Sequence, residues 1–426
     1  MEIVLIFLAL FAFLLAGVPV FLSLATLGIA ILLLTGQSLS GMAPSMFNAL
    51  NSFVLLAIPL FTLMSQIMLK AGVGDDLFDF VQTWLGSFRG GLAITTIVTC
   101  ALFGAICGSS AAAALTIGSI AIPALIRHNY KKEFASGLVG AGGTLAIMIP
   151  PSGPAIIYGA LTDTSVAKLF IAGIVPGVLI SLIFAVYAWL YCVKNPELKG
   201  ISTTWKAKWS ALKKVAFPLT LPPIITGGIY TGAFTPTEAA AVGASLSFVI
   251  VFLIQRRLRL RDTYEIMKDT AKTTCILMMI IACAVFFGQV LALNQIPQEM
   301  VKAIVNLKLG KWGFLILVNI LLLFLGCFLE VVSIILITVP ILYPAIKALG
   351  LDPIWFGVLF LLNMEIALIT PPVGMNLYVL MGVAKAKIEE IVRGVRVFIL
   401  LLGIALVIVM LQPEIALWLP KKAFGV

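Results

Sequence analysis

Apolar runs of helix length follow one another along almost the whole chain, and they decide what it can fold into. Of 426 residues, 62% are hydrophobic and 11% are charged, whereas a soluble domain carries about a quarter charged residues. A bilayer must therefore be the solvent, and there every backbone N–H and C=O group needs a partner within the protein. The runs are too long for the ~10-residue alternating strands of a barrel. The sequence predicts an all-α polytopic membrane protein with a single membrane domain over residues 1–426.

The basic residues indicate which loops face the cytoplasm. The net charge is +10, yet Lys and Arg occur in short patches between apolar segments, which is typical of orienting loops and excludes a nucleic-acid partner. Four patches stand out, at residues 127–132, 194–214, 256–261 and 385–396. We interpret residues 194–214 as a cytoplasmic basic linker between two halves of the chain, residues 1–193 and residues 215–426.

The topology follows from these patches and from breaks in the apolar runs. The run over residues 3–34 is too long for one span of ~20 residues and is interrupted around Pro19, so two short spans with an external N-terminus are expected. Between residues 214 and 256 the chain must leave and return, with an outside turn at 227–232. Membrane lipid surrounds these spans, and both termini are expected on the periplasmic side of a bacterial inner membrane.

Two segments are predicted to enter the membrane and turn back. Residues 91–126 are apolar throughout, but both ends lie near cytoplasmic basic residues, so a re-entrant hairpin with its tip at 104–110 is expected. Residues 312–346 repeat this pattern from the outside, with a tip at 326–333. The two hairpins would then open to opposite faces of the membrane.

Matching prolines and glycines indicate an internal repeat. Pro19 pairs with Pro236 and Pro123 with Pro340, each 217 residues later, while Gly173 pairs with Gly394, 221 residues later. A four-residue insertion after the second hairpin would reconcile the two spacings. Residues 146–153 and 367–374 are identical at four of eight positions, including a Pro-Pro pair. The basic loops place the two copies in opposite orientations in the membrane, so the repeat is expected to be inverted. Inverted repeats are typical of secondary transporters, whose binding site lies between the two repeats.

The two Pro-Pro pairs are expected to break membrane helices over residues 134–160 and 354–381, because proline removes an N–H donor and clashes with the preceding turn. Unpaired carbonyls at membrane depth suit Na⁺. A simpler alternative is that the prolines and small residues only aid helix packing. Each break lies opposite a hairpin tip, and we therefore predict two sodium sites. The first comprises Gly108, Ser109, Ser110, Ile149, Ser152 and Gly153, and the second comprises Glu330, Val331, Ser333, Thr370, Gly374 and Met375.

An anionic substrate would meet helix N-termini and polar side chains near these breaks. Ser109, Ser152 and Asn376 are the predicted substrate-binding residues. Glu330 and Glu365 are ionisable residues at predicted membrane depth, where such groups are functional by default, although backbone donors could also hold them in a structural role.

Four stretches resemble the large membrane subunit of tripartite ATP-independent periplasmic (TRAP) transporters, and the likeness spans essentially the whole chain. They are GSSAAAALTIGSIAIP at 108–123, IMIPPSGPAIIY at 147–158, TPTEAAAVG at 235–243 and ITPPVGMN at 369–376. The resemblance implies an elevator-type transporter that takes up a small organic anion with at least two Na⁺ ions, the anion being a carboxylate such as sialic acid or a C4-dicarboxylate. It also implies a periplasmic substrate-binding protein and a small membrane subunit. Because the chain begins directly in the first repeat, that subunit is expected as a separate chain.

Three other classes of protein fit the sequence less well. A stand-alone divalent-anion/sodium symporter would be expected to carry Ser-Asn-Thr at its hairpin tips, where this chain has Gly-Ser-Ser-Ala and Glu-Val-Val-Ser. A membrane enzyme would need a nucleophile with a base, or a metal cluster, and the single histidine, His128, lies in a cytoplasmic loop. A channel would favour a continuous pore over paired hairpins and broken helices. The chain is therefore predicted to be no enzyme.

Overall fold

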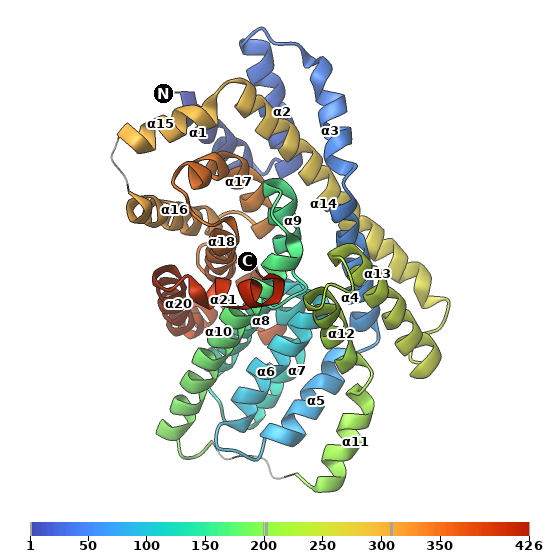
Figure 1. Cartoon of the computed structure of the whole chain (residues 1–426). Coiled ribbons are helices and arrows are strands. Elements are labelled where there is room, and N and C mark those ends of the chain that lie inside the picture. The colour runs from blue at the N-terminus through green and yellow to red at the C-terminus, as the bar shows by residue number, and fades with distance from the viewer. Residues whose placement is uncertain (1, 199, 201–202, 307–309, 426) are drawn as a thin grey trace.

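The computed structural model describes residues 2–198, 200, 203–306 and 310–425, and this part of the chain is helical with no β-strand (Figure 1). This confirms the all-α prediction. Eight helical segments of the described residues are long and apolar enough to cross a membrane. They are Phe53–Lys70, Ser110–Arg127, Lys132–Thr162, Val166–Lys194, Pro236–Ile254, Asp262–Leu293, Val331–Ala348 and Ile388–Leu411.

The first apolar run forms two helices, α1 (Glu2–Leu15) and α2 (Val20–Leu34). Pro19 is the residue before α2, a position where its missing N–H costs no helical hydrogen bond. Next come η1 (Leu39–Gly41), α3 (Met42–Leu50), η2 (Phe53–Leu56), α4 (Ala57–Lys70) and α5 (Val73–Leu85).

Residues 91–162 form two helix pairs. Helices α6 (Gly91–Cys107) and α7 (Ser110–Arg127) are joined at Gly108, whose φ is +61°. Glycine adopts this left-handed conformation without steric cost. Helices α8 (Lys132–Met148) and α9 (Gly153–Thr162) are separated where the first Pro-Pro pair interrupts the helix. Helix α10 (Val166–Lys194) follows.

The basic linker is partly helical, because α11 (Trp205–Val215) occupies its second half. Then come η3 (Pro218–Thr220), α12 (Leu221–Tyr230), α13 (Pro236–Phe248) and the π-helical η4 (Val249–Ile254). Thr235 and Glu238 form a reciprocal capping box at the start of α13, which satisfies two otherwise unpaired N–H groups. The turn expected at 227–232 lies slightly later, at 231–235, since Gly227 and Gly228 belong to α12.

The second half continues with α14 (Asp262–Leu293) and α15 (Ile296–Asn306). Helices α16 (Lys311–Gly326) and α17 (Val331–Ala348) form the second hairpin. Helices α18 (Pro353–Leu368) and α19 (Met375–Ala384) flank the second Pro-Pro pair, and α20 (Ile388–Leu411) and α21 (Glu414–Phe424) end the chain. In Figure 1, α6 and α7 lie in the lower half of the view and α16 and α17 in the upper half, with α8 and α18 between them.

The helix bounds correct one pairing of the sequence repeat. Helix α17 starts and ends 221 residues after α7, at 331 against 110 and at 348 against 127. Pro123 therefore matches Pro344, and its predicted pairing with Pro340 is wrong. The two prolines of α17 lie one helical turn apart, so the sequence offered both alignments. The extra residues consequently precede the second hairpin.

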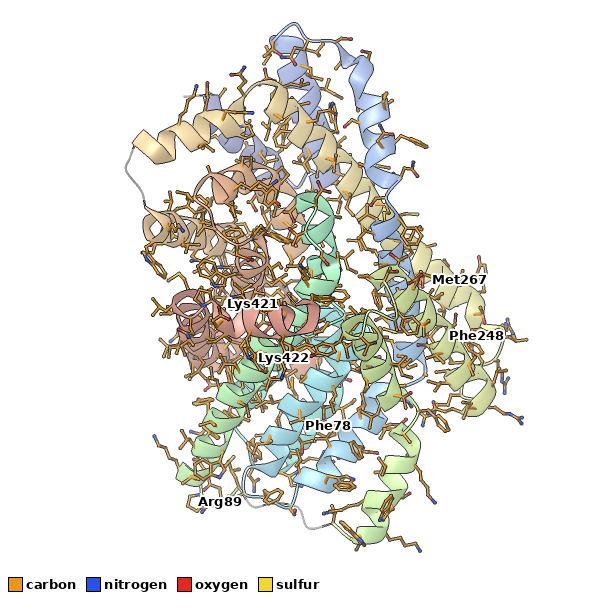
Figure 2. All side chains as sticks on the ribbon, in the orientation of Figure 1. Phe78, Arg89, Phe248, Met267, Lys421 and Lys422 are labelled. Carbon is orange, nitrogen blue, oxygen red and sulfur yellow. The ribbon has the colours of Figure 1, made fainter. Side chains whose placement is uncertain are left out.

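Helix α8 lies at the centre of the packing and contacts α6, α7, α18 and α20. Small residues allow these close approaches. A Cβ atom on Gly104 would lie 2.8 Å from the Cα of Ala146, and one on Gly143 would lie 3.0 Å from the Cβ of Ala114. Figure 2 shows side chains filling the spaces between the helices. The hairpin and the broken helix of the first half are therefore packed as one unit.

Candidate functional site

A cavity of about 340 Å³ lies where the two hairpin tips and the two broken helices meet. The first tip contributes residues 108–112 and the second contributes 330–332. Ser110, Gly153, Val331 and Met375 are the first residues of α7, α9, α17 and α19, and all four line the cavity. Each helix start carries unpaired N–H groups and a partial positive charge. The cavity is therefore suited to an anion.

The side chains around the cavity carry little charge. Glu330 is the only charged residue among the described residues that line it. A carboxylate ligand would find no Lys or Arg in this lining, so the helix starts and any bound cation would have to balance its charge. Ser109 caps α7 by accepting a hydrogen bond from the Ala112 N–H at 3.4 Å.

The first tip and the first break are in direct backbone contact. A Cβ atom on Gly108 would lie 2.6 Å from the carbonyl oxygen of Pro151. The hydroxyl of Ser152 is buried and has no hydrogen-bond partner among the described residues. Buried polar atoms are normally paired. A carbonyl and an unpaired hydroxyl beside a glycine tip are oxygen ligands of the kind that hard cations take.

Asn376 links the second broken helix to the first tip. Its side-chain nitrogen donates to Ser110 Oγ at 2.8 Å and to the Gly140 carbonyl at 3.3 Å. The side chain is fully buried, and its Oδ1 atom has no partner among the described residues. The predicted substrate residue Asn376 thus lies outside the cavity lining and is hydrogen-bonded to Ser110, which does line the cavity.

The second tip and the second break also touch. The Val373 N–H donates to the Cys327 carbonyl at 3.0 Å, and Ser333 Oγ donates to Glu330 Oε1 at 3.3 Å. Gly374 has a φ of +46°, and a Cβ there would lie 2.9 Å from the Thr370 carbonyl oxygen. The second tip is therefore held to its break by the backbone, as the first is.

The structure brings both sets of predicted site residues to one region, but only part of each set lines the cavity. Those that do are Gly108, Ser109, Ser110, Gly153, Glu330, Val331 and Met375. Those that lie outside its lining are Ile149, Ser152, Ser333, Thr370, Gly374 and Asn376. Thr370 Oγ1 instead donates to the carbonyl of Ile366, in the last turn of α18, at 2.6 Å.

Several lining residues were missed by the sequence reasoning. Thr62, Ser65 and Gln66 come from α4, and Thr273 comes from α14. The signal for α4 was present, because three polar residues at spacings of three and four share one face of a helix. Nothing in the sequence indicated that this face meets the hairpin tips.

A buried carboxyl group lies between the two halves. Glu365 on α18 is fully buried, and the hydroxyl of Thr144 on α8 donates to its Oε2 at 3.5 Å. The two residues are 221 apart, the same offset as between the bounds of α7 and α17. Glu365 Oε1 has no partner among the described residues.

Broken helices and hairpin tips around one cavity, in a chain with eight described helical segments apolar enough to cross a membrane, are typical of a multi-pass membrane transport protein. The sequence matches the family described as "Tripartite ATP-independent periplasmic transporter, DctM component" over residues 7–415. The chain belongs to this family and corresponds to its large permease subunit. It is therefore a transport permease of the inner membrane and no enzyme, and permeases of this family work with a substrate-binding protein.

Three curated relatives carry informative names. The chain is 42% identical to the C4-dicarboxylate TRAP transporter large permease protein DctM of Pseudomonas aeruginosa, with 92% of each chain covered. It is 34% identical to the sialic acid large permease SiaM of Vibrio cholerae, with 96% of each covered. It is also 35% identical to the isethionate permease DctMQ of Oleidesulfovibrio alaskensis, over 95% of this chain and 64% of that protein.

A solved structure supports the fold. The YdaH transporter of Alcanivorax borkumensis superposes with a TM-score of 0.63 at 12% sequence identity, covering 88% of this chain and 87% of the other. At this identity the likeness concerns the fold alone.

Proposed function

We propose that this permease takes up a small organic anion by sodium-coupled secondary transport, with the anion delivered by a periplasmic substrate-binding protein. The observation that carries the proposal is the cavity lined by the first residues of α7, α9, α17 and α19. Four helix starts favour an anion, and a volume of about 340 Å³ is at the small end of the ~300–1,000 Å³ usual for ligand pockets.

Sodium would bind where each tip meets its break, with at least two ions per transport cycle. Support for the first site comes from the Pro151 carbonyl beside Gly108 and from the unpaired oxygens of Ser152 and Asn376. At the second site, Glu330 would supply negative charge and the backbone of 370–375 would supply carbonyls. Sodium and the substrate would occupy adjoining positions. Bound sodium would therefore raise the affinity for the substrate, and bound substrate would raise the affinity for sodium by the same factor.

The transported anion is proposed to be a carboxylate. Relatives named for C4-dicarboxylate and sialic acid support this class. Hydroxyls of Ser109 and Ser110 and polar groups of α4 line the cavity and could donate hydrogen bonds to a carboxylate, while the helix starts would neutralise it. These residues would recognise the carboxyl group of the transported anion.

Movement by an elevator mechanism would carry the cavity from one face of the membrane to the other. Helices α6 to α9 and α16 to α19 would form the moving unit as an inverted repeat. Close packing of α8 on α6, α7 and α18 supports a single rigid body. Helices α4 and α14 contact each other, border the cavity from outside this unit and would stay fixed.

A small membrane subunit is the second proposed partner, as a separate chain. The DctMQ relative supports this proposal, because this chain aligns with 64% of its length and the remainder is long enough for a further membrane subunit.

Uptake into proteoliposomes tests the function. The purified chain, with its small subunit and binding protein, should accumulate a labelled C4-dicarboxylate or sialic acid only when an inward sodium gradient is imposed. Equal accumulation with a potassium gradient would refute sodium coupling. Equal uptake without the binding protein would instead favour the stand-alone symporter.

Site-directed labelling tests the orientation. A cysteine at Lys208 in the basic linker should react from the cytoplasm, and one at Gly232, where a side chain meets open space, should react from the periplasm. If the cysteine introduced at Gly232 reacted from the cytoplasm instead, the inverted topology would be wrong, and so would the periplasmic placement of both termini.

A further inference from the structure

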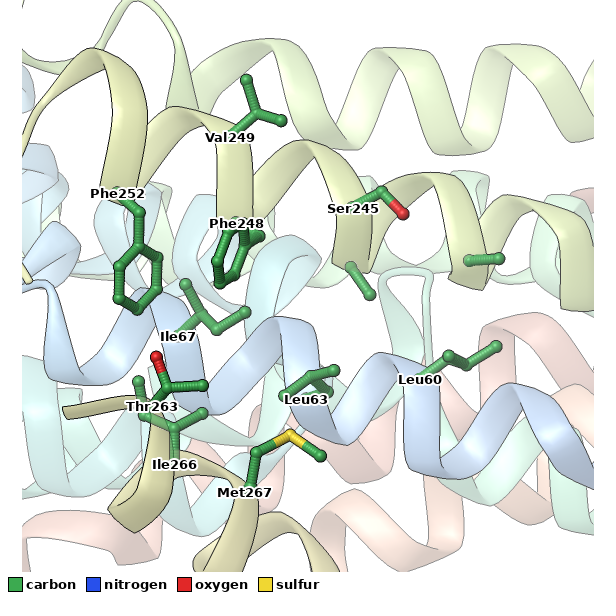
Figure 3. Close-up of a pocket in the computed structure, with 12 residues that line it drawn as sticks. Leu60, Leu63, Ile67, Ser245, Phe248, Val249, Phe252, Thr263, Ile266 and Met267 are labelled. Atoms are coloured by element: carbon green, nitrogen blue, oxygen red, sulfur yellow. The ribbon is translucent and has the colours of Figure 1, made fainter. Parts of the chain in front are cut away.

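A second, separate cavity opens on the outer surface of the helix bundle between α4, α13 with η4, and α14 (Figure 3). Its volume is about 450 Å³, and we call it the α4–α14 groove. Leu63, Phe248, Phe252 and Ile266 are among the residues that line it. All three walls belong to helices that are long and apolar enough to span a membrane. The groove therefore faces the hydrocarbon layer.

The groove reaches the surface of the protein. Met267 and Val249 line it and are 51% and 39% exposed. A crevice in contact with lipid is filled by whatever apolar group the surroundings provide, because an empty one forfeits dispersion contacts on one side. An α-helix of ~10 Å diameter would need about 420 Å³ for every turn. A volume of about 450 Å³ thus fits one or two acyl chains better than a partner helix of several turns.

Basic residues lie at one end of this groove. The arginine loop (residues 255–261) connects η4 to α14 and contains Arg256, Arg257, Arg259 and Arg261. Arg257 is engaged, since it forms an ion pair with Asp76 and donates to the Ala71 carbonyl at 3.1 Å. The other three arginines are exposed and form no ion pair among the described residues.

The neighbours of these arginines place the loop at the membrane surface. Leu260 and Tyr264 are 77% and 71% exposed, and exposed apolar and aromatic side chains beside arginines are typical of the lipid headgroup region. The loop is also anchored to the basic linker, because Gln255 Nε2 donates to the Lys214 carbonyl at 3.0 Å. The positively charged arginine loop therefore adjoins the apolar α4–α14 groove. This matches a phospholipid, in which a charged headgroup adjoins apolar acyl chains.

One polar atom inside the groove supports a ligand with a polar end. The Thr263 hydroxyl oxygen is buried and has no hydrogen-bond partner among the described residues. It lies in the first turn of α14, directly after the arginine loop, and Figure 3 shows it directed toward Ile67 and Phe252. The hydroxyl could donate a hydrogen bond to an ester or phosphate oxygen of a lipid. The π-helical η4 forms the opposite wall, and such segments are frequent at functional sites.

We propose that the α4–α14 groove binds one anionic phospholipid of the surrounding leaflet. Its acyl chain fills the groove, and its phosphate lies against Arg256, Arg259 and Arg261. Because α4 and α14 also border the central cavity, a lipid there would brace the two helices that flank the transport site.

Native mass spectrometry of the full chain tests the proposal, with palmitoyl-oleoyl phosphatidylglycerol and phosphatidylcholine as probes. Arg259→Gln with Arg261→Gln should weaken phosphatidylglycerol binding about 25-fold, since each basic residue near the surface contributes about fivefold, or ~1 kcal/mol. The matched control, Arg89→Gln with Lys194→Gln, removes the same charge elsewhere and should change binding less than twofold. Figure 2 shows Arg89 far from Phe248 and Met267.

A second pair of variants tests the groove itself. Ser245→Phe places a ring at a groove-lining position of α13 and should weaken both lipids, whereas Ser181→Phe on α10 should weaken neither. Equal affinity of the wild-type chain for the two lipids would overturn the proposal, as would equal loss in the arginine pair and its control. Displacement of the bound lipid by the small membrane subunit would assign the groove to that subunit and also overturn it.

Discussion

Gly108 offers the sharpest test of the first proposed sodium site. Its φ is +61°, so Gly108→Ala places a Cβ atom in the left-handed region, at a cost of about 1–2 kcal/mol. The new Cβ would also lie 2.6 Å from the Pro151 carbonyl oxygen. This oxygen belongs to the break and is the proposed ion ligand nearest the tip. The substitution therefore acts on the site without removing any ligand atom.

The size of the effect follows from the contact. Ordinary van der Waals separation begins at 3.4 Å, so tip and break must move apart by about 0.8 Å. Binding geometry has to be held within about 0.5 Å. We therefore expect the sodium concentration for half-maximal uptake to rise at least tenfold, which corresponds to about 1.4 kcal/mol.

The assay is substrate uptake against sodium concentration in proteoliposomes at matched protein amounts. One control separates the causes. Gly232→Ala introduces the same left-handed strain, with φ +74° and nothing within 4 Å of the new Cβ. It lies outside both proposed sodium sites and should keep the wild-type sodium dependence.

An unchanged half-saturation in Gly108→Ala, with full uptake, would refute the reasoning. It would mean that the tip and the break can separate without disturbing an ion. A loss as large in Gly232→Ala would also count against it, because it would assign the effect to general destabilisation.

Further predictions concern the second break, the first tip and the cytoplasmic side. Gly374→Val combines a φ of +46° with a Cβ position 2.9 Å from a carbonyl oxygen, so uptake should fall severely and recover partly when sodium is raised. Ser110→Ala removes the acceptor of a buried amide at 2.8 Å, worth about 1 kcal/mol, and the sodium half-saturation should rise about fivefold. Arg257→Ala leaves the carboxylate of Asp76, 8% exposed, without its ion partner. Thermal unfolding should show a loss of about 2 kcal/mol, below the ~3–5 kcal/mol of a fully buried pair, whereas Arg256→Ala should have little effect.

The sequence was informative about where helices begin and end. Proline and glycine act on the backbone locally, so the turn at Gly108 and the break at Pro150 could be located without knowledge of any neighbour. Helix α11 was missed, because a basic amphipathic stretch of this kind forms a helix only when its apolar side is covered. The Pro340 pairing failed because two prolines one turn apart on α17 gave the alignment no unique register.

The site was less predictable than the helices. Residues next to a break could be named, but whether each side chain enters the cavity depends on how the helix that follows is rotated. Ser109 and Ser110 enter it, while Asn376 turns back to bond Ser110. The polar face of α4 could have been predicted from the spacing of its polar residues. That this face lies against the hairpin tips could not have been predicted.

By itself, the sequence determined that the protein lies in a lipid bilayer, where its membrane helices are broken by Pro-Pro pairs, and to which family it belongs. These depend on composition, on local backbone chemistry and on motifs that are contiguous in the chain. Only the tertiary structure decided that both tips and both breaks share one cavity, that Thr144 on α8 contacts Glu365 on α18, and that the arginine loop adjoins an apolar groove. Such contacts join residues up to hundreds of positions apart, and they are fixed by how small residues let helices approach, which no local pattern records.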